Sequence, residues 1–376
     1  MEKTKSQRNS AVELLRILAM LFIVCSHCSI HGGLPAADSR ILFNTFLRDW
    51  FILGNLGADM FMLISGYVLC DHSHYSIRKS SVKMLPQVWF YSWLGLAIYL
   101  LTGHPFHMGI LLSSLFPTVF YQYWFFTYYF VLMFFFPYLN RLLNGLKRNQ
   151  LRTLITTMLV FWSVIPTFTN QHMGGGVMCH FVMFYSIGAY FKLYPDTIFQ
   201  KKGNRYLLTA VSGILMFASS VVLKLVFGDY MQYFYSRQSL LGVGFILGLF
   251  TMAIYHESFC SPWINRIAGC TFGVYLFHDH SLLRNLVWQE WLPKAKYYDS
   301  WTLIIAIAVS VLIVMTAGTV LEWIRQATVK KPMEKLLDRA IGFTQNRIQK
   351  LFNRMHAVFC EGQKISGQSV RLTAEK

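Results

Sequence analysis

The chain has 376 residues, of which 55% are hydrophobic, 16% aromatic and only 14% charged. Soluble proteins carry about a quarter charged residues, so the composition argues against a soluble enzyme and for a protein that crosses a membrane several times. The formal net charge is +17. Basic residues facing anionic lipid on the inner side of a membrane account for this excess, so nucleic-acid binding is not needed to explain it.

The hydrophobic residues gather in long stretches, which predict an all-α fold built as a polytopic transmembrane helix bundle. We count about ten stretches long enough, or nearly so, to cross a bilayer core of roughly 30 Å. The stretches cover residues 11–30, 50–70, 84–102, 122–139, 151–168, 177–194, 206–227, 239–256, 268–287 and 301–324.

The distribution of Lys and Arg predicts the orientation of the bundle. Most of these residues fall in segments that lie inside the cell if the N-terminus is inside, so both termini are predicted to be cytoplasmic. The first apolar stretch lacks a small-residue cleavage site and should remain as an anchor. We therefore predict a transmembrane domain over residues 1–324 in the cell (plasma) membrane, followed by a cytoplasmic tail over residues 325–376.

The tail is basic, and apolar residues such as Leu336, Ile341 and Leu351 recur in it near helical spacing. This pattern predicts a basic amphipathic helix lying on the inner leaflet. A partly disordered tail, most strongly after Glu361, is the alternative.

The first hydrophobic stretch holds two costly polar side chains, Arg16 and His27. On an α-helix they lie on one face, about 16 Å apart, and Glu13 is placed for an i,i+3 pair with Arg16. Ionisable residues inside a membrane segment usually face a protein interior or a wet cavity, so this helix is the first candidate for function.

Two cysteines, Cys25 and Cys28, lie close to His27 in this stretch and raise the question of a metal. A zinc site would need a further ligand from elsewhere in the chain. We prefer to interpret these cysteines as small packing residues, and we expect no metal cofactor.

The second stretch contains Asn55 and Asp59 at i,i+4 spacing, with Ser65 and Tyr67 nearer the cytoplasmic side. A carboxylate in the middle of a membrane is expensive, so Asp59 is a candidate functional residue, unless it only pairs with a basic neighbour. Glycines along the same stretch allow a helix or a ligand to approach closely, and helix packing is the simpler reading of them.

A basic loop with Arg78, Lys79 and Lys83 follows, and Pro86 begins the third stretch. These cations are explained equally well by positive-inside anchoring and by binding a ligand that bears phosphates.

These features together resemble the acyltransferase-3 family of multi-pass bacterial membrane enzymes, which O-acylate sugars and other cell-surface components. The resemblance rests first on Arg16, the ten residues after it and His27, and then on the segment NLGADMFMLISGY in the second stretch. Two other segments agree with the family pattern more loosely. They are the basic entry to the third stretch and the later segment TFGVYLFHDHSL, which contains Tyr275 and His278. Glu322 resembles an acidic residue found near the end of many relatives.

The chain departs from the family pattern at several positions. Thr271 stands where serine is usual, Asp279 stands where proline follows the histidine, and Lys83 replaces a more usual arginine. A lysine cannot grip a phosphate through two parallel hydrogen bonds, so a phosphate contact at Lys83 is less secure.

The resemblance implies an enzyme that moves an acyl group, most often acetyl, from cytoplasmic acyl-CoA to a hydroxyl of a sugar, a lipid-linked glycan or another cell-envelope acceptor. Arg16, Arg78, Lys79 and Lys83 would neutralise the phosphates of the nucleotide. A neutral His27 suits a general base, and acylation of His27 itself is an alternative. Asp59 would orient His27 or stabilise its imidazolium, although one sequence does not show that the two side chains touch.

His278 joins His27 and Asp59 as the third candidate catalytic residue, and its alternative is a hydrogen-bonded structural histidine. Further candidates are Glu13, Asn55, Ser65, Tyr67, Tyr275 and Glu322. Two other classes of protein remain open: a glycan or small-molecule transporter or flippase, which should show related halves, and a membrane glycosyltransferase, which tends to carry paired acidic residues outside.

Overall fold

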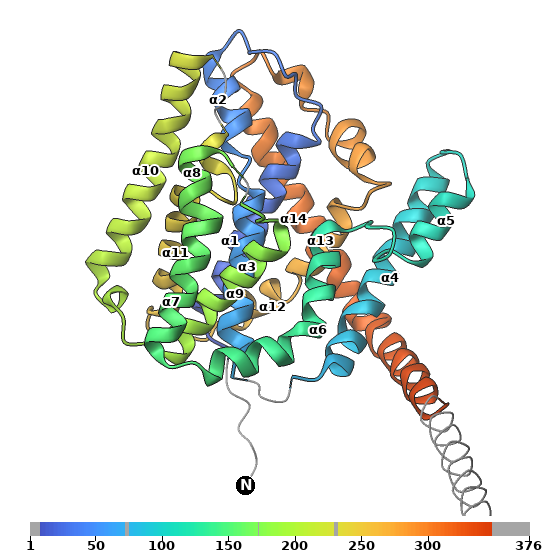
Figure 1. The fold of residues 1–376 in the computed structure, drawn as a ribbon. Helices are drawn as coiled ribbons and strands as arrows, with labels where there is room; N and C mark the ends of the chain where they lie inside the picture. Colours follow the sequence, from blue (N-terminus) through green and yellow to red (C-terminus); the bar gives the residue numbers. More distant parts are fainter. Residues whose placement is uncertain (1–7, 72–74, 172, 229–231, 348–376) are drawn as a thin grey trace, which may run out of the picture. The chain divides into compact units, whose positions relative to one another are not determined.

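The computed structural model describes residues 8–71, 75–171, 173–228 and 232–347, and these residues form helices and no β-strand. The chain divides into two compact units, one with residues 1–77 and 88–324 and the other with residues 78–87 and 325–376. Figure 1 labels the α-helices of the described residues. They are α1 (Ser10–Ile30), α2 (Leu42–Trp50), α3 (Gly54–Leu69), α4 (Ile77–Leu101), α5 (Met108–Leu115), α6 (Trp124–Gly145), α7 (Arg148–Leu159), α8 (Ile165–Thr169), α9 (Val177–Leu193), α10 (Lys202–Phe227), α11 (Leu240–Ile254), α12 (Pro262–Ala268), α13 (Thr271–His278) and α14 (Leu303–Thr328).

Six helical stretches of the described residues are long and apolar enough to cross a membrane. They correspond to the first, second, third, fifth, seventh and tenth of the predicted stretches. The shorter helices α9 and α11 are apolar as well. The all-helical fold is confirmed, while the count of about ten spans and the orientation of the termini stay predictions.

The ninth predicted stretch differs from the expectation, because residues 268–287 do not form one helix. The helix α13 ends at His278, and the chain turns at Asp279 and His280 before a short π-helical segment begins at Leu286. His278 thus lies at a helix end and not near the middle of a span. The side chains at this break take part in the candidate site described below.

Local sequence explains where several helices begin and end. Asn9 precedes α1, and its side chain accepts a hydrogen bond from the backbone N–H of Ala11, which satisfies one of the free donors of the first turn. Ser239 caps α11 in the same way through Gly242. Gly228 ends α10 with a positive φ of 75°, a conformation that glycine adopts without strain.

Helix α3 is the centre of the first unit, and it packs closely against α1 on one side and α9 on another (Figure 1). A side chain at Gly57 would collide with the backbone of Ala19 in α1, and one at Gly66 would collide with the backbone of Tyr185 in α9. The glycines of α3 therefore allow its neighbouring helices to pack closely, which is the simpler of the two interpretations given above.

The described part of the second unit contains residues 78–87 and 325–347. Residues 330–347 are helical, and the Nε atom of Arg78 donates a hydrogen bond of 2.8 Å to a carboxylate oxygen of Asp338. Leu351 and the other predicted apolar positions after residue 347 lie outside the described residues. The position of the tail on a membrane surface stays a prediction.

Candidate functional site

His27 lies in the last turn of α1, with only 8% of its surface exposed. The helix is unbroken from Ser10 to Ile30, so the predicted spacing between Arg16 and His27 along one helix holds. At the other end of the same face, an oxygen of Glu13 accepts a hydrogen bond of 3.1 Å from Arg16. The predicted i,i+3 pair is therefore present in the structure.

His27 contacts a second histidine, His278, which the chain brings from 251 positions away. The Nδ1 atom of His27 and the Nε2 atom of His278 lie 3.0 Å apart. The Nδ1 atom of His278 lies 2.6 Å from the carbonyl oxygen of Val274. The structure thus brings together two of the three residues that the sequence marked as catalytic.

This chain of contacts assigns the protons of both rings. A carbonyl oxygen only accepts hydrogen bonds, so Nδ1 of His278 carries a proton, and in the neutral ring Nε2 is then an acceptor. His27 must donate to it from Nδ1, which leaves the lone pair of His27 on Nε2. A neutral imidazole held in one tautomer is the state that a general base requires.

A carboxylate stands beside this pair of histidines. Asp279 has no exposed surface, and its Oδ1 atom lies 3.6 Å from Nδ1 of His27. Arg284 donates two hydrogen bonds to the same oxygen, of 2.9 Å from Nε and 2.8 Å from Nη2. In the sequence, Asp279 stands out only as a departure from the family pattern. An acidic residue next to a candidate histidine was the signal that could have placed it in the site.

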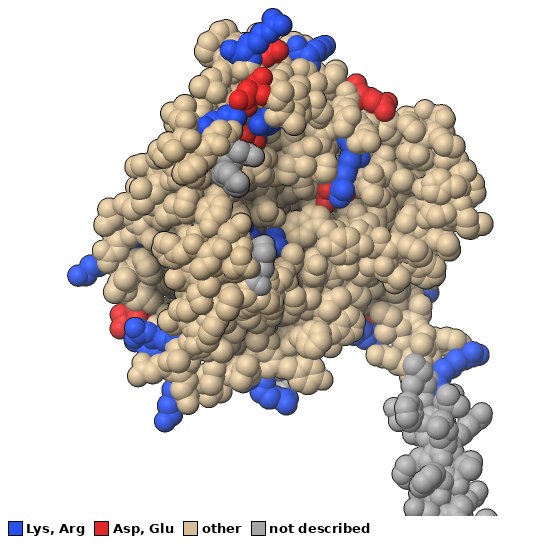
Figure 2. Space-filling view, turned by 45° about the horizontal axis from the view of Figure 1, so that its top comes forward, with Lys and Arg blue, Asp and Glu red and all other residues tan. Residues whose placement is uncertain are grey.

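Two partly exposed residues, His31 and Arg284, lie beside this cluster. The rings of His27 and His31 lie 5.2 Å apart. Burial lowers the pKa of His31, the charge of Arg284 lowers it further, and Asp279 acts in the opposite direction. Figure 2 shows that the face turned forward is hollowed and mostly uncharged, with a few charged side chains around the hollow.

Tyr275, a further candidate from the sequence, lies in the same region, in the helix that ends at His278. Its hydroxyl oxygen accepts a hydrogen bond of 3.2 Å from the backbone N–H of Phe125, and its ring centre lies 6.4 Å from that of His278. Tyr275 therefore links the start of α6 to the histidine pair.

Asp59 is paired with an arginine that the sequence analysis missed. Its Oδ1 atom lies 2.9 Å from Nε of Arg237, and Asp59 has no exposed surface. A further nitrogen of Arg237 lies 3.4 Å from Oδ1 of Asn55. The alternative reading of Asp59, a pair with a basic neighbour, is thus what the structure shows, and the carboxylate beside His27 is that of Asp279. A lone arginine in an aromatic outer segment was the available signal for Arg237.

Aromatic rings enclose the guanidinium of Arg237, which lies 5.4 Å from the ring centre of Trp124 and 5.2 Å from that of Phe181. This cluster lies at the level of the histidines, because a side chain at Gly54 would collide with Ser26, the neighbour of His27. An arginine, an amide and two aromatic rings therefore lie together at this level.

The remaining candidates of the first unit lie elsewhere. Ser65 donates a hydrogen bond to the carbonyl of Phe61 in its own helix, and the ring of Tyr67 faces Phe250. Glu322 is buried and accepts a hydrogen bond of 3.0 Å from Tyr91. None of these recorded contacts involves His27.

The basic loop residues Arg78 and Lys79, together with Lys83, belong to the second unit. The side chain of Arg78 is 41% exposed and forms the ion pair with Asp338. An exposed pair of this kind contributes little to stability.

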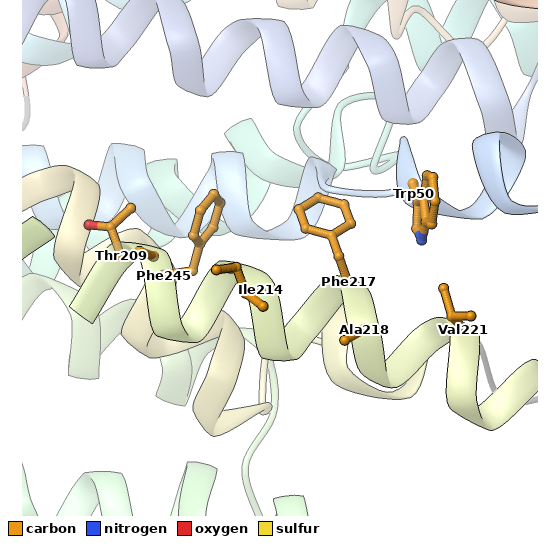
Figure 3. Close-up of a pocket in the computed structure, with 9 residues that line it drawn as sticks. Trp50, Thr209, Ile214, Phe217, Ala218, Val221 and Phe245 are labelled. Carbon is orange, nitrogen blue, oxygen red and sulfur yellow. The ribbon is translucent and has the colours of Figure 1, made fainter. Parts of the chain in front are cut away.

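An apolar groove of about 570 Å³ runs along α10, between residues of α10, Trp50 and Phe245 (Figure 3). No titratable side chain lines it, so it has no means for acid–base chemistry. The histidine cluster is the better candidate for a reaction site.

Comparison with known proteins bears on the reaction. The family model described as an acyltransferase domain, that of the acyltransferase-3 family, matches residues 9–320, nearly the whole chain. No curated protein and no solved structure matched the chain. The matched range includes His27, Asp59 and His278, and it makes a transporter or a glycosyltransferase unnecessary as an explanation. With its apolar helices, this chain belongs to the acyltransferase-3 family and is an acyltransferase of the membrane, transferring groups other than aminoacyl groups.

Proposed function

We propose that this enzyme transfers an acyl group, by default acetyl, from acyl-CoA to a hydroxyl of a sugar or lipid-linked glycan in the cell envelope. The observation that carries the proposal is the contact between His27 and His278, which leaves a lone pair on Nε2 of a buried, neutral imidazole. Family membership supplies the reaction class, and this pair supplies a base for it.

In the proposed reaction, Nε2 of His27 takes the proton of the acceptor hydroxyl as its oxygen attacks the thioester carbonyl. The bond from the carbonyl carbon to sulfur breaks, and the CoA thiolate leaves with a proton from the imidazolium. The carboxylate of Asp279 and the negative ends of α1 and α13 stabilise the positive charge on His27 between these two steps. We therefore assign to Asp279 the role first expected of Asp59.

The donor and acceptor are proposed to bind at different ends of α1. Arg16 would contact the phosphates of acyl-CoA, since cations are the usual partners of phosphate. The same role remains proposed for the loop residues Arg78, Lys79 and Lys83 on the basis of the sequence alone. Arg237, Asn55 and the aromatic rings around them would hold the acceptor. No metal takes part in this mechanism.

The direct test uses purified enzyme in lipid nanodiscs with radiolabelled acetyl-CoA and a cell-envelope glycan fraction. We expect label in the glycan with the unchanged enzyme, a loss of roughly 10²–10⁴-fold for His27→Ala, and no loss for the control His104→Ala, a loop histidine outside the site. Full transfer by His27→Ala would exclude it as the base. Transfer from another labelled donor but never from acetyl-CoA would exclude the proposed donor.

His278 is a positioning residue in this scheme, because it acts through the tautomer of His27. His278→Gln should lower kcat by roughly tenfold or more while the KM for acetyl-CoA stays within about twofold. An equal rise in KM without a fall in kcat would show that His278 serves binding and not the orientation of the base.

A further inference from the structure

The surroundings of His27 contain a set of possible metal ligands, of which His31 has no part in the proposed reaction. One nitrogen each of His27 and His31 and one oxygen of Asp279 all lie within 4.8 Å of one another. We infer that these three residues form a binding site for a divalent transition-metal ion of the zinc type, and that an ion bound there inhibits the acyl transfer.

Helix geometry explains why the two imidazoles converge. His27 and His31 are four positions apart at the end of α1, and the backbone N–H of His31 donates to the carbonyl of His27 at 2.9 Å, so the helical turn continues to His31. Residues at this spacing lie on one face, which is how a helix presents two histidines to a zinc ion. Two imidazoles and a carboxylate suit zinc, cobalt and nickel better than magnesium or calcium, which prefer oxygen ligands.

Asp279 provides the second line of support. It has no exposed surface, and among the described residues its Oδ2 atom makes no hydrogen bond of normal geometry, although the hydroxyl of Tyr275 interacts with the carboxylate. A buried oxygen without a partner is costly, and a bound cation would satisfy it. The C-terminal ends of α1 and α13 also meet here, and their partial negative charge favours a cation.

Arg284 opposes the binding of an ion, because it already holds Oδ1 of Asp279 through two hydrogen bonds. The ion must share the carboxylate with Arg284 or displace it. Binding is therefore expected to be reversible and weaker than in a structural zinc site. The same competition means that removal of Arg284 should tighten it.

A bound metal ion would block the proposed acyl transfer, because it needs a lone pair of His27. A bound ion occupies a lone pair of His27, so that ring cannot take the proton of the acceptor hydroxyl at the same time. This inhibition rests on the proposed function of His27, whereas the binding of the ion does not.

The binding test measures the visible absorption of Co²⁺ added to the purified full chain in detergent. We expect a saturable signal that His31→Ala weakens by roughly tenfold or more, while His107→Ala, an exposed histidine elsewhere, leaves it unchanged. Arg284→Gln should shift the half-saturation to lower Co²⁺. An unchanged Co²⁺ affinity in His31→Ala, in a protein with the melting temperature of the unchanged chain, would overturn the site.

The activity test then adds Zn²⁺ during acetyl transfer. We expect inhibition that chelator reverses, and His31→Ala should keep its activity but need roughly tenfold more Zn²⁺ for the same inhibition. Equal inhibition of both proteins would overturn the regulatory part. Saturable Co²⁺ binding in a protein without transferase activity would leave the metal site standing and contradict the proposed function.

Discussion

At the scale of single residues, the proposed chemistry depends on which nitrogen of His27 carries its proton. The carbonyl oxygen of Val274 accepts a hydrogen bond from Nδ1 of His278. Nε2 of His278 must then accept a hydrogen bond from Nδ1 of His27, so the proton of His27 lies on Nδ1. The two buried carboxylates have different partners. Asp279 lies close to both His27 and Arg284, whereas Asp59 pairs with Arg237. Each anion is matched to a cation, as the low dielectric of the interior requires.

The pair of Asp59 and Arg237 leads to a prediction about stability. Arg237→Gln leaves a buried carboxylate without its cation and should lower the free energy of unfolding by about 3–5 kcal/mol. Adding Asp59→Asn to that variant removes the stranded charge and should restore much of the loss. Thermal unfolding in detergent ranks the three proteins.

The exposed pair of Arg78 and Asp338 is the matched control for this experiment. Arg78→Gln should change the free energy of unfolding by less than about 1 kcal/mol, because exposed ion pairs contribute little. If the double variant at Asp59 and Arg237 were no more stable than Arg237→Gln alone, the buried charge would not be the cause of the loss.

At the scale of helices, the site is made where helices end. α1 ends at Ile30 and α13 at His278, and the catalytic candidates occupy the last turn of each. A helix end is suited to this use because its free carbonyl groups favour positive charge and its side chains are no longer confined between two turns. The glycine contacts of α3 then fix how α1 lies against the rest of the unit.

Gly66 provides the prediction at this scale. Gly66→Ala places a methyl group against the backbone of Tyr185, which cannot move without displacing α9, so it should destabilise the enzyme by about 1–3 kcal/mol. Gly203, in the first turn of α10, has no atom within 4 Å of an added Cβ. The control Gly203→Ala should be neutral or stabilising by about 0.4–1 kcal/mol. Equal melting temperatures for the two variants would contradict the close packing of α3 on α9.

At the scale of the whole molecule, the distribution of charge sets the expected orientation in the membrane. The excess of Lys and Arg predicts that both termini lie in the cytoplasm, with the start of α1 inside and His27 towards the outer half. This orientation would place the proposed phosphate contacts on the cytoplasmic side, where acyl-CoA is found, and His27 towards the side of the proposed cell-envelope acceptor.

Reporter fusions test this orientation. A green fluorescent protein fused after Lys376 should fluoresce, and alkaline phosphatase inserted after His104, between the third stretch and α5, should be active. The reciprocal fusions serve as controls and should be silent. Active phosphatase at the C-terminus would place the tail outside and would exclude the proposed route of acyl-CoA to Arg16.

Some features of the site could be predicted because they are local. The pair of Glu13 and Arg16 follows from spacing along one helix, and the cost of ionisable residues in apolar stretches pointed to His27 and Asp59. The partners of these residues are not local. His278, Asp279 and Arg237 meet them across more than 170 positions of chain, and no spacing rule links residues so far apart.

The sequence by itself determined that this is a helical membrane protein and pointed to the first helix as the candidate for function, because composition and helical periodicity act within a single segment. It also carried the motifs that mark an acyltransferase. Only the tertiary structure showed that His278 and Asp279 lie beside His27 while Asp59 pairs with Arg237. The physical reason is that a buried charge or lone pair takes the partner that packing brings within hydrogen-bond distance, and packing is a property of the whole chain.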